Sequence, residues 1–185
     1  MKKAKSDRRT IDKVFVLLGA AVAVVMLVIG GLSWKAYSFA KSSVTTELSA
    51  QKIYFPAKDS AAFNALPAAD QTAMGKYSGQ QLLTGDQAKV YANNFIGVHL
   101  SKIAGGKTYA EISTEALADP TNAQLKQQQQ TLFQGETLRG LLLGDGYAYW
   151  TFGQIAKFAA LAAFAGTAVM IVLVGLGVRH MTKLS

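Results

Sequence analysis

Two long, uninterrupted apolar runs dominate the hydropathy pattern of the chain. Residues 14–32 form a stretch of 19 without a charged side chain, and residues 158–178 form a stretch of 21. About 20 apolar residues in an α-helix cross a hydrocarbon core of ~30 Å. Neither run contains the proline, asparagine, glutamine or histidine that would mark a polar stripe. We therefore predict two transmembrane helices, at residues 14–34 and 154–178.

The segment between the two runs has the periodicity of amphipathic helices. Apolar residues recur at three- and four-residue intervals between Asp86 and Ile103, which predicts a helix with one apolar face. Capping-box patterns predict three helix starts, at Thr84, Thr108 and Thr121. Glycine or proline stop signals predict three helix ends, at 105–106, 119–120 and 144–146.

Longer helical segments complete the predicted fold. Residues 121–143 can run as one helix, and residues 38–54 can continue the first span outward as far as Pro56. Alternating strand patterns are nearly absent. We therefore predict an all-α protein in which two transmembrane helices flank a small extracytoplasmic helical bundle.

The distribution of charge predicts the orientation of the two spans. The formal net charge is +8, and the 20 residues that lie outside the spans at the two ends hold 8 basic side chains. The 125 residues from 33 to 157 hold only 11. Lysine and arginine collect in short cytoplasmic flanks. We therefore place a basic tail (1–13) and a second tail (179–185) in the cytoplasm, and the domain at 35–153 outside it.

A cleaved signal peptide is the alternative interpretation of the first run. Residues 38–40 offer small side chains at the two positions that a signal peptidase requires. Signal sequences have apolar cores of ~7–15 residues, however, and this run is longer. Aromatic residues such as Trp34 follow it at the position of a membrane interface. We favour an uncleaved anchor.

Composition argues against most catalytic and cofactor chemistry. The chain has no cysteine, which excludes disulfides, iron–sulfur clusters and thiolate zinc sites. Its two histidines, His99 and His180, are predicted on opposite sides of the membrane and cannot join in one metal site. The basic excess lies beside the apolar runs rather than on a separate nucleic-acid-binding face. We expect no cofactor, no metal, no catalytic residues and no nucleic-acid partner.

Small residues recur at helical spacing in both spans. Such residues let the backbones of two helices approach closely in lipid. The predicted packing positions are Gly19, Ala23 and Gly30 in the first span, and Ala159, Ala163 and Gly166 in the second. The partner of these faces is either the other span or a different membrane protein, and the sequence does not separate the two.

Six residues of the middle segment are candidates for ligand or partner binding. Four of them could line a pocket inside the bundle: Tyr91, Phe95, His99 and Tyr109. For His99 a buried structural role is the simpler interpretation. Glu136 and Arg139 are spaced to form an ion pair on a helix surface, and a partner-binding patch is the alternative.

Parts of the chain resemble an actinobacterial two-span membrane family of unknown function. The resemblance covers about residues 50–178 and lies in the segments 52–58, 87–100, 105–110 and 135–143. It implies a location in an actinobacterial cell envelope. The family is often labelled an aromatic ring-opening dioxygenase, which would require a non-haem iron site, typically with two histidines and a carboxylate. His99 alone cannot build that site, so we interpret the label as a naming error for this chain, or as describing a subunit without the metal.

Three functions follow as hypotheses from these observations. The first is a non-catalytic membrane protein that serves as an accessory subunit or interaction module of an envelope complex, in contact with the bilayer and with another membrane protein or a second copy of itself. The second is an extracytoplasmic sensor or carrier of a small molecule or lipid. The third, an enzyme, has the least support.

Overall fold

The computed structural model describes residues 2–183, with side chains from residue 8 onward, and the chain divides into two compact units. The first unit, the helix pair, contains α1 (Lys2–Gln51) through Phe39 and α8 (Tyr149–Lys183) from Gly153. The second, the middle unit, runs from Ala40 to Phe152. Helices make up 83% of the chain, and no strand occurs among the described residues. The prediction of an all-α fold is confirmed.

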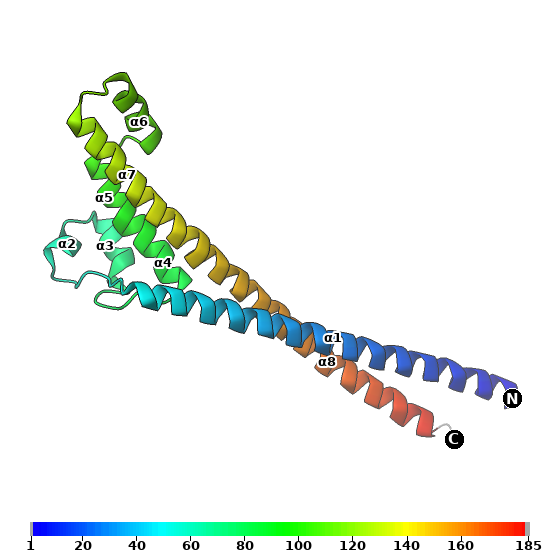
Figure 1. The fold of residues 1–185 in the computed structure, drawn as a ribbon. Helices are drawn as coiled ribbons and strands as arrows, with labels where there is room; N and C mark the ends of the chain where they lie inside the picture. The colour runs from blue at the N-terminus through cyan, green and yellow to red at the C-terminus, as the bar shows by residue number, and fades with distance from the viewer. Residues whose placement is uncertain (1, 184–185) are drawn as a thin grey trace. The chain divides into compact units, whose positions relative to one another are not determined.

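The helix pair contains the two predicted spans. Both helices are long and apolar enough to cross a membrane, with mean hydropathies of 2.8 and 2.4 in their most apolar windows. They run antiparallel and side by side (Figure 1), since Val16 of α1 reaches Gly177 of α8 while Gly30 lies against Phe164. Within this unit the two helices are therefore direct packing partners.

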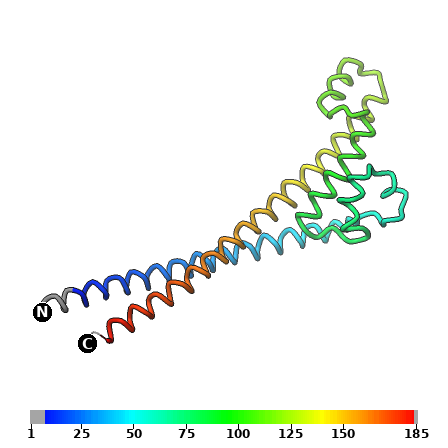
Figure 2. Tube along the Cα trace, turned by 180° about the vertical axis from the view of Figure 1, so that it is seen from behind, coloured from blue at the N-terminus to red at the C-terminus, as the bar shows by residue number. Residues whose placement is uncertain are grey.

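The middle unit folds the intervening chain into short helices. In Figure 2 this part of the chain turns back on itself several times between the end of α1 and the start of α8. The elements after α1 are α2 (Ala61–Asn64), α3 (Ala68–Gly75), α4 (Gly85–Tyr91), η1 (Ala92–Ile96), α5 (Gly97–Ile103), α6 (Tyr109–Ala118), α7 (Ala123–Leu141) and η2 (Leu142–Ala148). The two η elements are π-helices, in which backbone hydrogen bonds join residues five apart rather than four apart as in an α-helix.

Two of the three predicted capping boxes form. The hydroxyls of Thr84 and Thr108 accept the backbone N–H groups of Gln87 and Glu111, whose side chains reach back to the cap N–H groups. The third prediction was wrong: α7 is capped by Asn122, whose side chain accepts the N–H of Leu125. The Thr121 hydroxyl instead donates to Asp119 at 2.8 Å and so is committed to the preceding turn.

The predicted helix ends are correct at two sites and wrong at one. Helix α5 ends at Ile103, before Gly105 and Gly106 take positive φ angles, and α6 ends at Ala118. Residues 144–146 do not break the helix, because they lie inside η2 and the chain continues directly into α8. A π-turn accommodates the glycines while keeping the backbone hydrogen bonds. The first long helix ends at Gln51, close to the predicted limit.

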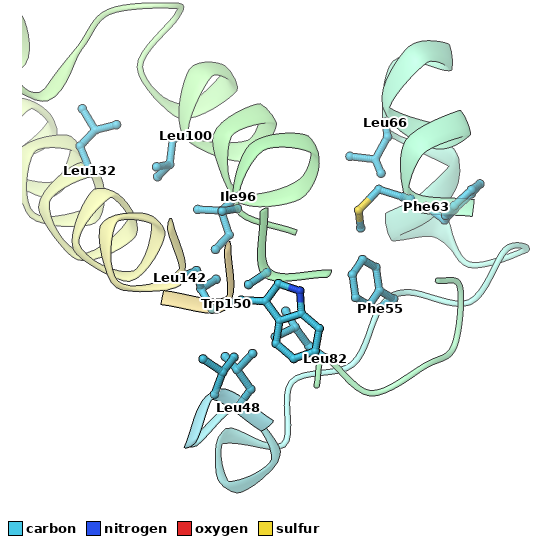
Figure 3. Packing of buried hydrophobic residues seen from close by; sticks show 14 of the residues in the cluster. Leu48, Phe55, Phe63, Leu66, Leu82, Ile96, Leu100, Leu132, Leu142 and Trp150 are labelled. Carbon is cyan, nitrogen blue, oxygen red and sulfur yellow. The ribbon is translucent and has the colours of Figure 1, made fainter. Parts of the chain in front are cut away.

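One hydrophobic core holds the middle unit together. Side chains from the end of α1, from the turn before α2, and from α3, α4, α5, α7 and α8 are buried in it, and Met74 and Leu82 are completely inaccessible. In Figure 3, Trp150 lies between Leu82 and Leu142, with Phe55 nearby. Gly85 allows this arrangement, because a β-carbon there would overlap Trp150 and lie 2.8 Å from the carbonyl oxygen of Gly146.

Candidate functional site

Each long helix has glycines against which a larger side chain of the other helix packs. We call these positions glycine seats. A β-carbon at Gly30 would lie 2.7 Å from the ring of Phe164, and one at Gly177 would lie 2.7 Å from Val16. A β-carbon at Gly19 would lie 3.0 Å from Val174. Gly166 in turn receives the end of Met26. In lipid no hydrophobic effect drives two helices together. Helices there pack tightly when small residues allow close approach and large side chains fill the space.

The predicted packing face of the spans is largely the face that the structure uses, with one correction. Ala23 and Ala163 are buried between the helices, as are Gly19 and Gly30. Ala159 is exposed, and its neighbour Ala160 is completely buried instead. Ala160 lies three residues before Ala163 on the same face. The sequence, rich in alanine throughout this stretch, did not distinguish the two positions.

The remaining surface of the helix pair is apolar. Phe15, Leu17 and Phe158 are each about two-thirds exposed, at 68%, 70% and 65%. At the end of the unit nearest Phe39, the ring of Trp34 meets that of Tyr37 edge to face at 5.4 Å, and the Lys157 ammonium lies 5.6 Å above the Tyr37 ring. A cation over an aromatic ring beside a long apolar surface is typical of a membrane interface.

Three of the four predicted pocket residues lie in one column on the same helical run. The rings of Tyr91 and Phe95 lie 4.9 Å apart, and those of Phe95 and His99 lie 4.5 Å apart. Phe55 meets Tyr91 from the side, at 5.4 Å. Burial raises the pKa of the Tyr91 hydroxyl, because the phenolate would lose solvation. These rings fill the space between them, so the column is a packing feature.

The fourth predicted pocket residue, Tyr109, lies apart from this column, and His99 makes a further contact within its own helix. His99 Nδ1 lies 2.8 Å from the carbonyl oxygen of Phe95, one turn earlier in its own helix. Tyr109 contacts Phe133 of α7, at 5.9 Å between ring centroids. The structure therefore gives His99 a structural contact and places Tyr109 with a different partner from the column.

Glu136 and Arg139 form the predicted ion pair, and Arg139 also binds a side chain of η1. Its Nη1 lies 3.1 Å from the Glu136 carboxylate, and its Nη2 donates to the Asn93 side chain at 3.1 Å. The guanidinium lies against Gly97, since a β-carbon there would be in van der Waals contact with the Arg139 Nε at 3.4 Å. That Nε is buried and has no acceptor among the described residues. The fork of Arg139 thereby joins α7 to η1.

A polar cavity of about 350 Å³ opens beside this ion pair. Besides Glu136, Arg139 and Asn93 it is lined by the loop at 106–108 and by residues of α5 and α7. Lys107 at its edge is paired with Glu115 at 2.6 Å. Sequence reasoning found the ion pair from its spacing but missed Asn93 and Gly97, because their contacts join segments more than 40 residues apart.

A second, larger cavity is a groove between the end of α1 and η2, entirely within the middle unit. Its volume is about 410 Å³. The side of α1 contributes Ser43, Val44, Glu47, Leu48 and Gln51, and the opposite side contributes Leu141, Leu142, Asp145, Gly146 and Tyr149. We call this feature the α1–η2 groove. Sequence reasoning missed it because residues 144–146 were predicted to break the helix that forms one of its walls.

Trp150 lies directly after this wall and is 8% exposed. Its indole nitrogen is buried and has no hydrogen-bond acceptor among the described residues. In Figure 3 the nitrogen lies on the edge of the indole that faces Phe55. Trp150 therefore contributes to the middle unit through the packing of its ring in the core.

The residues present do not fit the iron site that the dioxygenase label would require. Among the described residues no group of three histidine, cysteine, aspartate or glutamate side chains is placed to hold a metal ion. His99 belongs to the middle unit and His180 to the helix pair.

The comparisons with known proteins assign no family or function to this chain. No family model, no curated protein and no solved structure matches this chain.

Proposed function

We propose that this chain is a two-pass integral membrane protein that serves as an accessory subunit or interaction module of a cell-envelope complex. In this proposal both termini are cytoplasmic, and the middle unit lies outside and binds another membrane protein. The observation that carries the proposal is the apolar surface that remains on the helix pair after its two helices have packed against each other. A surface of this extent is stable in lipid and not in water.

The middle unit supports the second half of the proposal. It keeps large apolar side chains exposed along α7 and at the start of α8, among them Leu141 at 54% and Phe152 at 55%. Exposed apolar side chains that gather on one surface mark interaction sites more often than side chains scattered singly. The α1–η2 groove lies beside this surface.

Cysteine labelling in intact cells tests the topology. The chain has no cysteine, so single cysteines can be introduced without background. Leu117, which is 78% exposed in the middle unit, should react as Leu117→Cys with a membrane-impermeant maleimide added outside. Lys183→Cys, at the end of α8, is the matched control and should react only after the cells are lysed. Labelling of Lys183→Cys in intact cells, or protection of Leu117→Cys, would contradict the topology.

Purification in mild detergent tests the assignment as a subunit. We expect the native protein to elute with a second membrane protein or as a defined oligomer. The same band should appear after cross-linking in intact cells. A monomer in several mild detergents, with no cross-linked species, would contradict the proposal.

A small-molecule sensor or carrier is the second candidate, and one observation favours it. The cavity of about 350 Å³ beside Arg139 lies within the range of known ligand sites and has charged and hydroxyl groups in its lining. Ligand-observed NMR with a library of small carboxylic acids would detect binding, and Arg139→Gln should abolish it. Binding that survives this substitution would place the ligand elsewhere.

No metal-binding cluster among the described residues supports the enzymatic alternative. Metal analysis of the purified full-length protein is the direct measurement. Iron at one equivalent per chain would contradict our proposal and would require ligands that come from a second chain.

A further inference from the structure

We propose that the α1–η2 groove receives a helix of a partner membrane protein, with a lysine or arginine of that helix lying between Glu47 and Asp145. The inference rests on the proposed function and names the chemistry of the partner. It follows from the apolar floor of the groove, from the two carboxylates that line it, and from its length.

The floor of the groove is apolar and fixed by the core. Val44 and Leu48 are 3% exposed and Leu142 is 2% exposed, so these three side chains are buried in the middle unit and cannot withdraw. Gly146 holds the η2 wall against α4, because a β-carbon there would lie 3.0 Å from Ala88, and its β-carbon position lies in ordinary contact distance, 3.9 Å, of Leu48 on α1. The floor is therefore formed before any partner arrives, which lowers the entropic cost of binding.

The two rims of the groove are more exposed than its floor, and they differ from each other chemically. On α1, Ser43, Glu47 and Gln51 follow one another at intervals of four residues, which places them in one polar row. On the other rim, Leu141 and Tyr149 are 54% and 37% exposed and lie on either side of Asp145 in the chain. A partner must therefore offer an apolar surface and at least one group that satisfies a carboxylate.

Both carboxylates of the groove lack a partner within the middle unit. Residues 40–152 contain nine acidic side chains. Five of them accept hydrogen bonds or ion pairs: Asp70, Glu111, Glu115, Asp119 and Glu136. The remaining four are Glu47, Asp59, Asp86 and Asp145, and two of these four line this one groove. Lys89 of α4 does reach η2, but it donates to the Tyr147 hydroxyl at 3.1 Å and not to Asp145.

The charge and size of the groove define the partner. Covering two unpaired carboxylates with apolar surface alone would cost free energy, whereas a cation from the partner offsets that cost. The stem of a lysine or arginine can lie along the apolar floor while its charged end reaches the rim. The α1 rim from residue 43 to 51 is about 12 Å long, which matches roughly two turns of a partner helix.

Site-specific cross-linking in intact cells tests the inference with the full chain. A photo-activatable amino acid replaces Leu141 on the rim. The matched control position is Gln130, which is exposed on α7 and does not line the groove. We expect a cross-linked partner from position 141 only, and the partner peptide that is recovered should contain a lysine or arginine. Glu47→Lys combined with Asp145→Lys should reduce the cross-link by about tenfold or more.

A charge swap makes the test decisive. Replacing the recovered basic residue of the partner with glutamate should restore the cross-link to the Glu47→Lys, Asp145→Lys variant. Both positions are exposed and unpartnered, so the double variant should keep the melting temperature of the parent chain. A partner peptide without a basic residue, a cross-link unaffected by the charge reversal, or a cross-link only to a second copy of this chain would overturn the inference.

The outcomes also separate this inference from the proposed function. If the charge reversal leaves co-purification with the partner intact and abolishes no cross-link, the chain is still an interaction module, but the groove is not its docking site. If no partner is recovered by either method, the proposed function fails as well.

Discussion

At the scale of single residues, glycine positions decide which surfaces can meet. In the helix pair the glycine seats are filled by larger side chains of the other helix, as Gly30 is by Phe164. In the middle unit Gly85 plays the same role for the side chain of Trp150. Gly31, the neighbour of Gly30, has nothing within 4 Å of its β-carbon position. Adjacent glycines therefore differ completely in what a methyl group would do.

This contrast gives a matched pair of substitutions. Gly30→Ala should destabilise the helix pair by about 1–3 kcal/mol, because the added β-carbon overlaps the ring of Phe164. Gly31→Ala should be neutral or stabilising by up to about 1 kcal/mol, since alanine has the higher helix propensity. Unfolding in mixed detergent micelles measures both. Equal effects of the two substitutions would show that Gly30 is not a packing seat.

Contacts within one helix of the candidate sites could be predicted from the sequence, whereas contacts between distant segments could not. The pairing of Glu136 with Arg139 follows from spacing within one helix and is confirmed. The contact of Arg139 with Asn93 and the separation of Tyr109 from the aromatic column depend on how distant segments pack. No local pattern encodes these contacts.

At the scale of elements, helix ends that depend on local capping could be predicted from the sequence, and those that depend on tertiary packing could not. The helices that start at Thr84 and Thr108 were predicted correctly because a capping box is complete within four residues. The start of α7 was predicted one residue early, because Asp119 competes for the Thr121 hydroxyl. Residues 144–146 were predicted to end a helix, but packing of α4 on η2 keeps them helical. Glycine is a weak stop signal where a neighbouring helix needs close approach.

The contact of α4 with η2 predicts the effect of a second glycine pair. Gly85→Ala should destabilise the middle unit by about 3 kcal/mol or more, because the β-carbon meets Trp150 and the backbone oxygen of Gly146, which cannot move aside. Gly140→Ala, where nothing lies within 4 Å, is the control and should leave stability unchanged or raised. Thermal unfolding followed by circular dichroism gives both values. A Gly85→Ala variant as stable as the control would rule out the close contact.

The two capping boxes predict a pH dependence for only one helix start. Hydrogen bonds from the backbone N–H and hydroxyl of Thr108 lower the pKa of the Glu111 carboxyl below its usual 4.5. A carboxyl whose pKa is lowered by folding stabilises the folded state at pH values above its unfolded pKa. That stabilisation is lost as the pH falls through the folded value, below 4.5.

Amide hydrogen exchange can follow the N-terminus of α6 across this range. Protection there should fall as the solution is acidified, and Glu111→Gln should remove the dependence. The box at Thr84 uses Gln87, which does not titrate, so the start of α4 serves as an internal control. Equal loss of protection at both helix starts would point to global acid unfolding instead.

At the scale of the whole molecule, the two units are stabilised by different forces. The middle unit buries a core of apolar side chains away from water. The helix pair buries few side chains and depends on close packing through glycine, with its remaining surface suited to lipid. Denaturants that act on burial from water should therefore affect the two units unequally.

Urea unfolding in detergent micelles should proceed in two stages. The middle unit should lose its helices and become sensitive to protease first, because urea weakens hydrophobic burial. The helix pair should remain helical and protected at urea concentrations that unfold the middle unit. Circular dichroism combined with limited proteolysis distinguishes the stages. One cooperative transition that removes all helicity would contradict two separate sources of stability.

The buried indole of Trp150 gives the protein an intrinsic optical reporter. The chain has two tryptophans, so Trp34→Phe leaves Trp150 as the sole indole fluorophore. Because its ring is buried and its nitrogen has no acceptor in the described part of the chain, its emission should lie at the short-wavelength end of the range. Partial unfolding that lets solvent reach the ring would shift the emission maximum to longer wavelengths. The folding of the middle unit can therefore be followed in real time without an added dye.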